Sequence, residues 1–127
     1  MGVALAVLVL AGCAELVTKD SPPEAKREAV RERALARWDL IIKGQPDKAY
    51  DYLSRGSQQV ISRDEFAARM KVTAFRTADV QKTECSESSC RAWVHITYDF
   101  KIWKAVDLTM QENWLIENGN VWYVWTP

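Results

Sequence analysis

The chain has 127 residues, which suits one ordinary domain and leaves no room for a second. Hydrophobic residues make up 48% and charged residues 27%, and five glycines and four prolines are too few for a fibrous or low-complexity protein, so we expect a globular fold. Because 17 Lys and Arg balance 17 Asp and Glu, no basic excess is available to bind a nucleic-acid backbone, and we expect no nucleic-acid partner.

Residues 1–12 carry no charged side chain, and Val3 to Leu10 form an apolar run. This run is shorter than the roughly 20 residues of a membrane-spanning helix and is typical of a signal peptide. Leu10-Ala11-Gly12-Cys13 follows and resembles the lipobox of bacterial lipoproteins, in which cleavage before the cysteine leaves it as the lipid-bearing N-terminus. A buried N-terminal helix or strand is the alternative interpretation.

The lipobox resemblance implies a signal peptide over residues 1–12, lipidation of Cys13 and a protein anchored in a membrane on its periplasmic side. Ala14 stands where an aspartate would resemble a retention signal for the inner membrane, which favours the outer membrane in a Gram-negative host. The polar stretch that ends in Ser21-Pro22-Pro23 is stiff and non-helical, so we interpret residues 13–23 as the lipidated cysteine and its tether. The folded domain is expected over residues 24–127.

Ser21, Pro22 and Glu24 match a capping box with proline at the first helical position. The pattern predicts an amphipathic helix from about Glu24 to Lys43, because apolar residues recur every three or four positions at Val30, Ala34, Trp38 and Ile41. The other face is charged. We interpret it as facing solvent, with a contact to anionic lipid as the alternative.

Gly44 ends this helix, and Gln45-Pro46-Asp47 predicts the start of a short helix that continues through Leu53. The segment Ser54-Arg55-Gly56-Ser57 is expected to break it. Ser62-Arg63-Asp64-Glu65 repeats the capping-box pattern and predicts a third helix of two or three turns.

From about residue 75 the pattern changes to alternation of apolar and polar residues, with many β-branched and aromatic side chains, which indicates strands. The short loops between them favour antiparallel neighbours, predicted near Phe75 to Glu84, Arg91 to Ile102, Val106 to Ile116, and Val121 to Trp125. The sequence therefore predicts an α+β fold, with N-terminal helices packed on a four-stranded antiparallel sheet.

Asn118-Gly119 is the pair that a two-residue type I′ hairpin requires, so it fixes the register of the last two strands. Trp114 is expected opposite Tyr123 and Glu112 opposite Trp125. One face then collects Val106, Leu108, Met110, Glu112, Trp114, Ile116, Val121, Tyr123 and Trp125. Glu112 is the exception on this apolar face. A carboxylate there either meets solvent or an arginine from the helices, or acts as a functional acid with a raised pKa.

Cys85 and Cys90 bracket a polar loop between two strands, and in an exported protein we expect them to form a disulfide. Their spacing does not match a thioredoxin-type motif, and one histidine with no zinc-type ligand spacing predicts neither a metal site nor a cofactor. His95 has its nearest acid on the same strand, Asp99, about 13 Å away, so we interpret it as a partly exposed sheet residue.

Two segments add a family resemblance. Trp38 with Gly44-Gln45-Pro46-Asp47-Lys48-Ala49-Tyr50 and Leu53-Ser54, and Glu112-Asn113-Trp114 with Asn118-Gly119-Asn120-Val121-Trp122-Tyr123, are similar to segments of small bacterial members of the NTF2-like superfamily, also called cystatin-like or SnoaL-like. The resemblance covers about residues 24–126. It implies a curved sheet wrapped around a long helix to form a cone.

In enzymatic members of this superfamily, such as ketosteroid isomerases and scytalone dehydratases, an Asp or a His–Asp pair in the cone performs the chemistry, and no such pair maps onto this chain. The resemblance therefore implies a non-catalytic envelope lipoprotein that binds a small hydrophobic ligand or another envelope protein, with a homodimer through the sheet as a further possibility. The candidate pocket residues are Trp38, Tyr50, Met110, Glu112, Trp114 and Tyr123. The alternative is a lipid-anchored isomerase, dehydratase or hydrolase with Glu112 as base and Tyr50 or Tyr52 as hydrogen-bond donor.

Overall fold

The computed structural model describes residue 2 and residues 16–127, so the predicted lipidation site at Cys13 and nearly all of the predicted signal peptide lie outside the described residues. The helices come first: α1 (Pro23–Ile42), α2 (Pro46–Ala49), the 3₁₀-helix η1 (Tyr50–Tyr52), α3 (Arg55–Val60) and α4 (Arg63–Lys71). The strands follow: β1 (Ala74–Ser86), β2 (Ser89–Phe100), β3 (Trp103–Glu117) and β4 (Asn120–Val124).

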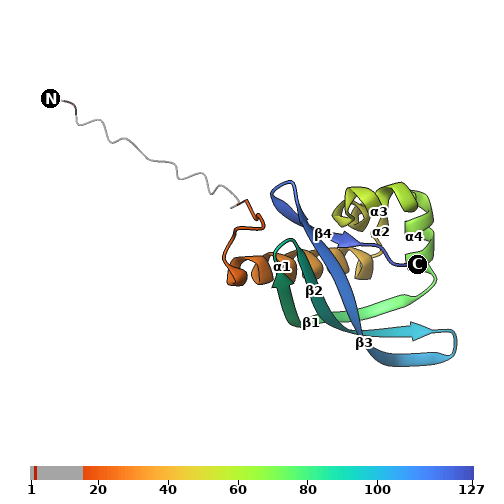
Figure 1. Ribbon diagram of the computed structural model, residues 1–127. Coiled ribbons are helices and arrows are strands. Elements are labelled where there is room, and N and C mark those ends of the chain that lie inside the picture. Colours follow the sequence, from red (N-terminus) through yellow and green to blue (C-terminus); the bar gives the residue numbers. More distant parts are fainter. Residues whose placement is uncertain (1, 3–15) are drawn as a thin grey trace.

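The four strands form one antiparallel sheet in the order β1-β2-β3-β4. The long helix α1 packs against β1, β2 and β4, while α2, α3 and α4 cluster at the end of α1 where the C-terminus also lies (Figure 1). This arrangement confirms the predicted α+β fold. Over the part of the chain that is described, no helix is both long enough and apolar enough to span a membrane.

Helix α1 begins at Pro23, as the proline pattern predicts, but the predicted capping box is wrong. The N-cap residue is Pro22, and no side chain caps the helix. Ser21 is engaged in the turn before the helix, where its hydroxyl oxygen accepts a hydrogen bond from the Thr18 N–H at 2.9 Å. The local turn therefore competes successfully for the hydroxyl that the cap would need.

The charged face of α1 is less solvated than predicted. Arg31 donates to the carbonyl oxygen of Val80 on β1, and Arg33 donates to that of Val121 on β4, both at 2.7 Å. The predicted apolar stripe is buried, and Lys26 and Arg37 are buried with it. Long cationic side chains thus fasten α1 to both edge strands, because they can reach carbonyl oxygens while their stems cover apolar surface.

One helix that follows α1 in the sequence, α3, is not predicted from the residue pattern. The segment around Ser54 was expected to be a break, yet α3 starts directly after it, with the Ser54 hydroxyl accepting from the Ser57 N–H. The cap at Ser62 is confirmed, because its hydroxyl accepts from the Glu65 N–H at 3.2 Å and α4 follows.

The Asn118-Gly119 turn sets the register as predicted, with Trp114 opposite Tyr123 and Leu115 opposite Trp122. Strand β4 begins and ends one residue earlier than expected, at Asn120 and Val124, so Trp125 does not pair with Glu112. The backbone N–H of Trp125 instead donates to the Ser57 hydroxyl at 2.9 Å, which draws the chain toward α3.

The described part of the predicted tether is docked on the domain. Val17 is buried, and its N–H donates to the carbonyl oxygen of Gly119 at 2.9 Å. The Lys26 ammonium group donates to the carbonyl oxygen of Lys19 at 2.5 Å. From residue 17 onward, the chain therefore contacts the folded domain.

Candidate functional site

The sequence exception, Glu112, lies at the centre of the molecule under α1. Its side chain accepts three hydrogen bonds: Oε2 from Arg37 and from the Trp38 indole N–H, each at 2.9 Å, and Oε1 from the Trp114 indole N–H at 3.3 Å. Arg37 and Glu112 are only 2% and 3% exposed. The carboxylate is thus enclosed by one cation and two indole donors.

Arg37 is held by its surroundings as tightly as Glu112. Its guanidinium carbon lies 3.7 Å from the centre of the Tyr123 ring and 5.3 Å from that of Trp38. Its Nε is buried and has no hydrogen-bond partner. The ion pair at 2.9 Å and the aromatic contacts compensate the burial of this charge, because a guanidinium stacks on ring faces at little desolvation cost.

This geometry suits a structural ion pair and not a general base. A base must reach the proton that it abstracts within hydrogen-bond distance or through one water. The oxygens of Glu112 are instead directed at Arg37, Trp38 and Trp114, all of which belong to the packed interior. Of the two interpretations that the sequence leaves open, the structure therefore shows the arginine partner.

Burial raises the pKa of Tyr123, with the charge of Glu112 acting in the same direction and Arg37 and Thr126 opposing it. Tyr123 is therefore a neutral phenol at neutral pH. It serves as an aromatic platform for Arg37 and packs edge-on against Trp114, with ring centres 5.7 Å apart.

Neither Tyr50 nor Tyr52, the two tyrosines considered as donors, hydrogen-bonds to Glu112. The Tyr50 hydroxyl donates to the carbonyl oxygen of Ile61 at 2.7 Å, which ties η1 to the end of α3. The Tyr52 ring lies under Arg33, whose guanidinium carbon is 4.6 Å from the ring centre. The positions of these side chains thus do not favour the alternative with a tyrosine donor beside Glu112.

The six candidate pocket residues pack into the core or against it and do not line an open cone. Trp38 lies edge-on to Phe75 with ring centres 5.1 Å apart, and Met110 is half-buried against the same core. The interior that the resemblance implies as a cavity is filled in this region by Trp38, Glu112 and Trp114. Trp114 also borders a groove at the molecular surface.

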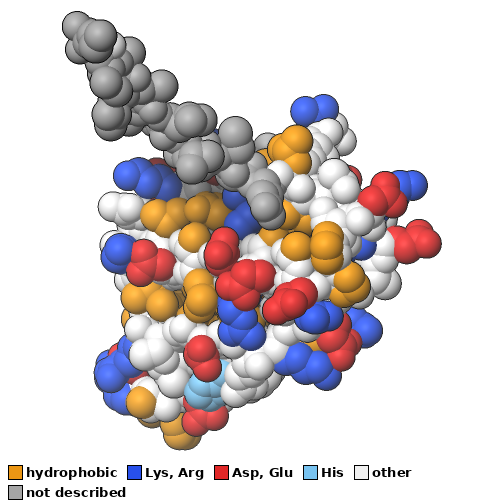
Figure 2. Space-filling view, turned by 90° about the vertical axis from the view of Figure 1, so that its left-hand side faces the viewer, with side chains coloured by type: hydrophobic (Ala, Val, Ile, Leu, Met, Phe, Trp, Pro, Cys, Tyr) orange, Lys and Arg blue, Asp and Glu red, His pale blue; other side chains and the backbone are white. Residues whose placement is uncertain are grey.

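Two surface grooves are candidate binding places. The first, which we call the anchor groove, runs between α1 and the β3–β4 turn and has a volume of ≈ 670 Å³. Its apolar lining comes from Leu16, Val17, Pro22, Ala25, Ala29 and Trp122, and its polar lining includes Glu28, Glu32 and Arg33. Hydrophobic and acidic side chains lie side by side on the molecular face where the chain enters the fold (Figure 2).

Arg33 forms one wall of the anchor groove. Its guanidinium carbon lies 4.6 Å from the centre of the Tyr52 ring and 4.8 Å from that of Trp122. Burial lowers the pKa of Arg33, and the interaction with Tyr52 opposes this change, but a guanidinium stays charged at neutral pH. The groove therefore offers an apolar floor with a fixed positive charge at its side.

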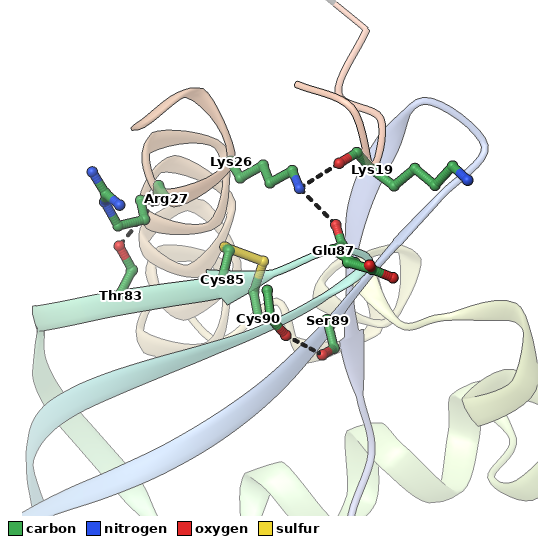
Figure 3. Close-up of a disulfide and its surroundings, with 9 residues drawn as sticks. Lys19, Lys26, Arg27, Thr83, Cys85, Glu87, Ser89 and Cys90 are labelled. Atoms are coloured by element: carbon green, nitrogen blue, oxygen red, sulfur yellow. Dashed lines mark hydrogen bonds between the residues drawn. A yellow bond between two sulfur atoms is a disulfide. The ribbon is translucent and has the colours of Figure 1, made fainter. Parts of the chain in front are cut away.

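The second groove has a volume of ≈ 660 Å³ and lies beside Cys85 and Cys90, with Arg27 and Arg91 in its lining. The two sulfur atoms are 2.15 Å apart, which confirms the predicted disulfide pair. The strands extend further than predicted, so Cys85 pairs directly with Cys90 across the ladder and only two residues form the turn. Nearby, the Lys26 ammonium group also donates to the carbonyl oxygen of Glu87 in this turn, at 2.7 Å (Figure 3).

His95 gains an acidic neighbour that sequence spacing does not reveal. Its Nε2 lies 3.6 Å from the Asp107 carboxylate on β3, across the strand and not along it. The histidine is 34% exposed at its side chain and the aspartate 72%, so the pair faces solvent. Within residues 16–127, no cluster of three His, Cys, Asp or Glu side chains could hold a metal ion.

The residue that sequence reasoning did not name is Arg37. A signal was present, since Arg37 follows Ala34 by three positions and precedes Ile41 by four, which places it on the apolar stripe of α1. A charged residue on that stripe and a charged residue of opposite sign on the apolar sheet face are natural partners.

Comparison with known proteins identifies the fold and nothing finer. No model of a known protein family matches the sequence, and no curated protein sequence matches it. The solution structure of a SEC-C motif containing protein from Rhodopseudomonas palustris is similar, with a TM-score of 0.63, 10% sequence identity and 72% of each chain covered. The crystal structure of a Campylobacter jejuni protein described as an NTF2-like transpeptidase has a TM-score of 0.55 and 6% identity, covering 75% of this chain and 96% of that one.

At such low identities the likeness extends to the fold alone. With the order of its helices and strands, it supports an NTF2-like fold for this chain, as the resemblance implies.

Proposed function

We propose that the protein is a non-catalytic lipoprotein of the bacterial envelope whose NTF2-like domain binds a small hydrophobic ligand or another envelope protein at its outer surface. The observation that carries this proposal is the closed ion pair between Arg37 and Glu112. The central carboxylate has its acceptor oxygens occupied by Arg37 and two indoles, so Glu112 does not offer a substrate a free acid or base.

In this proposal the ligand or partner binds in a groove at the surface, and the anchor groove is a better candidate than the groove beside the disulfide. Ligand sites combine an apolar lining with a few fixed polar groups. The anchor groove has this character, with Ala25, Ala29 and Trp122 as apolar surface and Arg33 clamped between two rings. An acidic apolar molecule or an amphipathic segment of another protein matches this lining.

The position of the groove agrees with a lipid anchor. Val17 is fixed to the fold by its bond to Gly119, and Cys13 precedes it by four residues, so the lipid would lie within about 14 Å of Val17 along the extended chain. Leu16, Val17 and Gly119 also line the anchor groove. In this proposal the groove opens beside the bilayer, where apolar ligands and other anchored proteins are concentrated.

Native mass spectrometry of the full chain, extracted from membranes in a mild detergent, tests the proposal. The expected spectrum contains a chain that begins at an acylated Cys13 and retains a small molecule or a partner. The same spectrum reports whether two copies associate. A chain with a free Cys13 or an uncleaved leader would contradict the lipoprotein assignment.

Two matched variants locate the binding place. Ala25→Trp puts an indole into the anchor groove, and Lys48→Trp puts the same group on an exposed position of α2 outside that groove. Ala25→Trp should abolish the retained mass, while Lys48→Trp should keep it. Equal retention by both variants would place binding elsewhere.

A further inference from the structure

We infer that the tip of the β2–β3 hairpin, residues 99–104, is a membrane-contacting device that inserts its apolar side chains among anionic phospholipids. The sequence of the tip is Asp99-Phe100-Lys101-Ile102-Trp103-Lys104. Neither the family resemblance nor the lipid anchor calls for such a contact, and the inference does not depend on lipidation of Cys13.

The tip exposes large apolar side chains where the fold has no need of them. Ile102 is 84% exposed and Trp103 is 64% exposed, and Phe100 lies opposite Trp103 across the hairpin. The hairpin extends beyond the helices that cover the rest of the sheet (Figure 1). Single exposed apolar residues are common, but three adjoining ones at the end of a projecting hairpin form a patch that marks a contact site.

The backbone of the tip is also unfavourable for these residues. Lys101 has φ 55° and Ala105 has φ 49°, in the left-handed region where a Cβ meets steric hindrance. At the β3–β4 hairpin the corresponding turn is Asn118-Gly119, which suits this conformation. Turn stability therefore does not explain a lysine at position 101, which points to a functional reason.

The charge of the tip fits an anionic surface. Lys101 and Lys104 flank Ile102 and Trp103, and neither lysine has an ion-pair partner among residues 16–127. The nearby Asp99 carboxylate is already occupied by Arg76 at 2.8 Å and by the Ala105 N–H at 2.8 Å. Two free lysines beside Trp and Ile match the interfacial zone of a bilayer, where indoles and lysines sit at the headgroup level.

A bilayer fits this shape better than a protein surface does. A stable protein interface usually buries about 800 Å² on each partner, which a narrow hairpin tip with three large apolar side chains does not supply. A bilayer interface accepts a convex projection, and each apolar group that it buries stabilises the contact. Anionic headgroups add an electrostatic attraction for each lysine near the surface.

The tip also lies far from the point where the chain enters the fold. Strand β3 runs 15 residues from Trp103 to Glu117, and the β3–β4 turn beside Val17 follows directly. At about 3.3 Å per residue, the tip is roughly 46 Å along the strand from that turn. A lipid at Cys13 and the tip can contact the same bilayer only when the long strands lie along the membrane.

A local probe tests the inference in the full chain. An environment-sensitive fluorescent amino acid replaces Ile102 in one variant and Val60, which is 73% exposed on α3, in a matched control. Each is reconstituted with vesicles of phosphatidylcholine, with or without phosphatidylglycerol, and a share of the lipids carries a nitroxide on the acyl chain. On vesicles with phosphatidylglycerol, the probe at 102 should shift to the blue and be quenched severalfold more than the probe at 60.

A second pair of changes tests the role of charge. Lys101→Glu with Lys104→Glu should remove most of the quenching at position 102 without changing that at position 60. Equal quenching at 102 and 60 would overturn the inference, as would a blue shift at 102 without quenching, because that result shows a protein contact. Quenching of equal size on phosphatidylcholine alone would overturn the assignment of anionic phospholipids.

Discussion

The two halves of strand β3 have the same alternating sequence pattern but differ in how far their side chains are buried. Met110, Glu112, Trp114 and Ile116 continue the face that begins with Val106 and Leu108, yet Trp114 is 0% exposed while Leu108 is 45% exposed. The alternation decides which face a side chain takes. Whether that face is buried depends on the helical layer that covers it.

The lengths of the elements explain where the cover ends. Helix α1 has 20 residues, or about 30 Å at 1.5 Å per residue, whereas β3 has 15 residues, or about 50 Å at 3.3 Å per residue. A helix of this length cannot cover strands of that length from end to end. The β2–β3 hairpin is the part that extends beyond it (Figure 1).

The half of the sheet that the helices cover and the half that they leave uncovered also differ in how their charged side chains are paired. In the covered half, Arg37 and Glu112 form a buried pair supported by indole donors. In the uncovered half, Arg76 and Asp99 pair at the surface at 2.8 Å. The surface pair contributes little because water screens it, while breaking the buried pair leaves a charge that nothing solvates.

The largest expected effect therefore comes from breaking the buried pair. Arg37→Met should lower the free energy of unfolding by about 3 to 5 kcal/mol, because Glu112 keeps its charge without a cation. Glu112→Gln should also destabilise, since it leaves Arg37 as the unpaired charge. Urea unfolding measured by tryptophan fluorescence gives both values.

The double variant is the control for this prediction. Arg37→Met with Glu112→Leu removes both charges and should recover most of the stability that the single changes lose, as replacement of a buried ion pair often does. If Arg37→Met alone leaves the stability unchanged, the carboxylate is not a charged partner in the fold, and a functional acid at Glu112 returns as the better interpretation.

Much of the covered half could be predicted from the sequence, because local rules determine it. The stripe on α1 and the Asn118-Gly119 turn each have a period or a residue pair with one structural meaning. The capping boxes show the limit, since Ser62 caps a helix as predicted while Ser21 is drawn into another turn. A hydroxyl has several local partners, and tertiary packing selects among them.

The candidate site and the exposed tip of the β2–β3 hairpin could not be predicted in the same way. The site needs Arg37 and Glu112 to meet across 75 positions of sequence, and only the packing of α1 on the sheet brings them together. Helix α3 was missed because Ser-Arg-Gly-Ser has the composition of a loop, although Ser54 is also a good N-cap. The exposure of the hairpin tip depends on the lengths of two elements, which no single window of sequence contains.

The next largest effect concerns the disulfide at the covered end of the sheet. Cys85→Ser with Cys90→Ser should lower the free energy of unfolding by about 2 kcal/mol, because closing so short a loop removes that much chain entropy from the unfolded state. Urea unfolding of the oxidised chain and of the double variant measures it. If wild-type protein isolated from cells without reductant had two free thiols at these positions, the bond would not form in the cell.

A pH titration separates the covered aromatic cluster from the exposed surface. The folded-state pKa of Tyr123 is raised above its ordinary value of 10.0, so its contribution to stability is fully present below the unfolded pKa and is lost as pH rises from there through the folded pKa. Denaturant unfolding at increasing alkaline pH should show this decline. Tyr123→Phe should make the decline smaller, and an unchanged decline would assign it to other groups.

The smallest effect has the opposite sign and lies in the uncovered half. Lys101→Gly should raise the free energy of unfolding by up to about 1 kcal/mol, because glycine adopts a φ of 55° without the steric cost that a Cβ brings. The matched change at the β3–β4 hairpin, Gly119→Ala, should destabilise, since its φ is 76° and a Cβ there would lie 2.6 Å from Leu16 Cδ2.

Lys101→Gly should at the same time weaken binding to vesicles that contain phosphatidylglycerol, since it removes one of the two free lysines. A gain in stability together with a loss of membrane contact would show that Lys101 serves binding at the expense of turn stability. If Lys101→Gly destabilises the fold instead, the turn depends on the lysine, and the positive φ is no evidence for a role in binding.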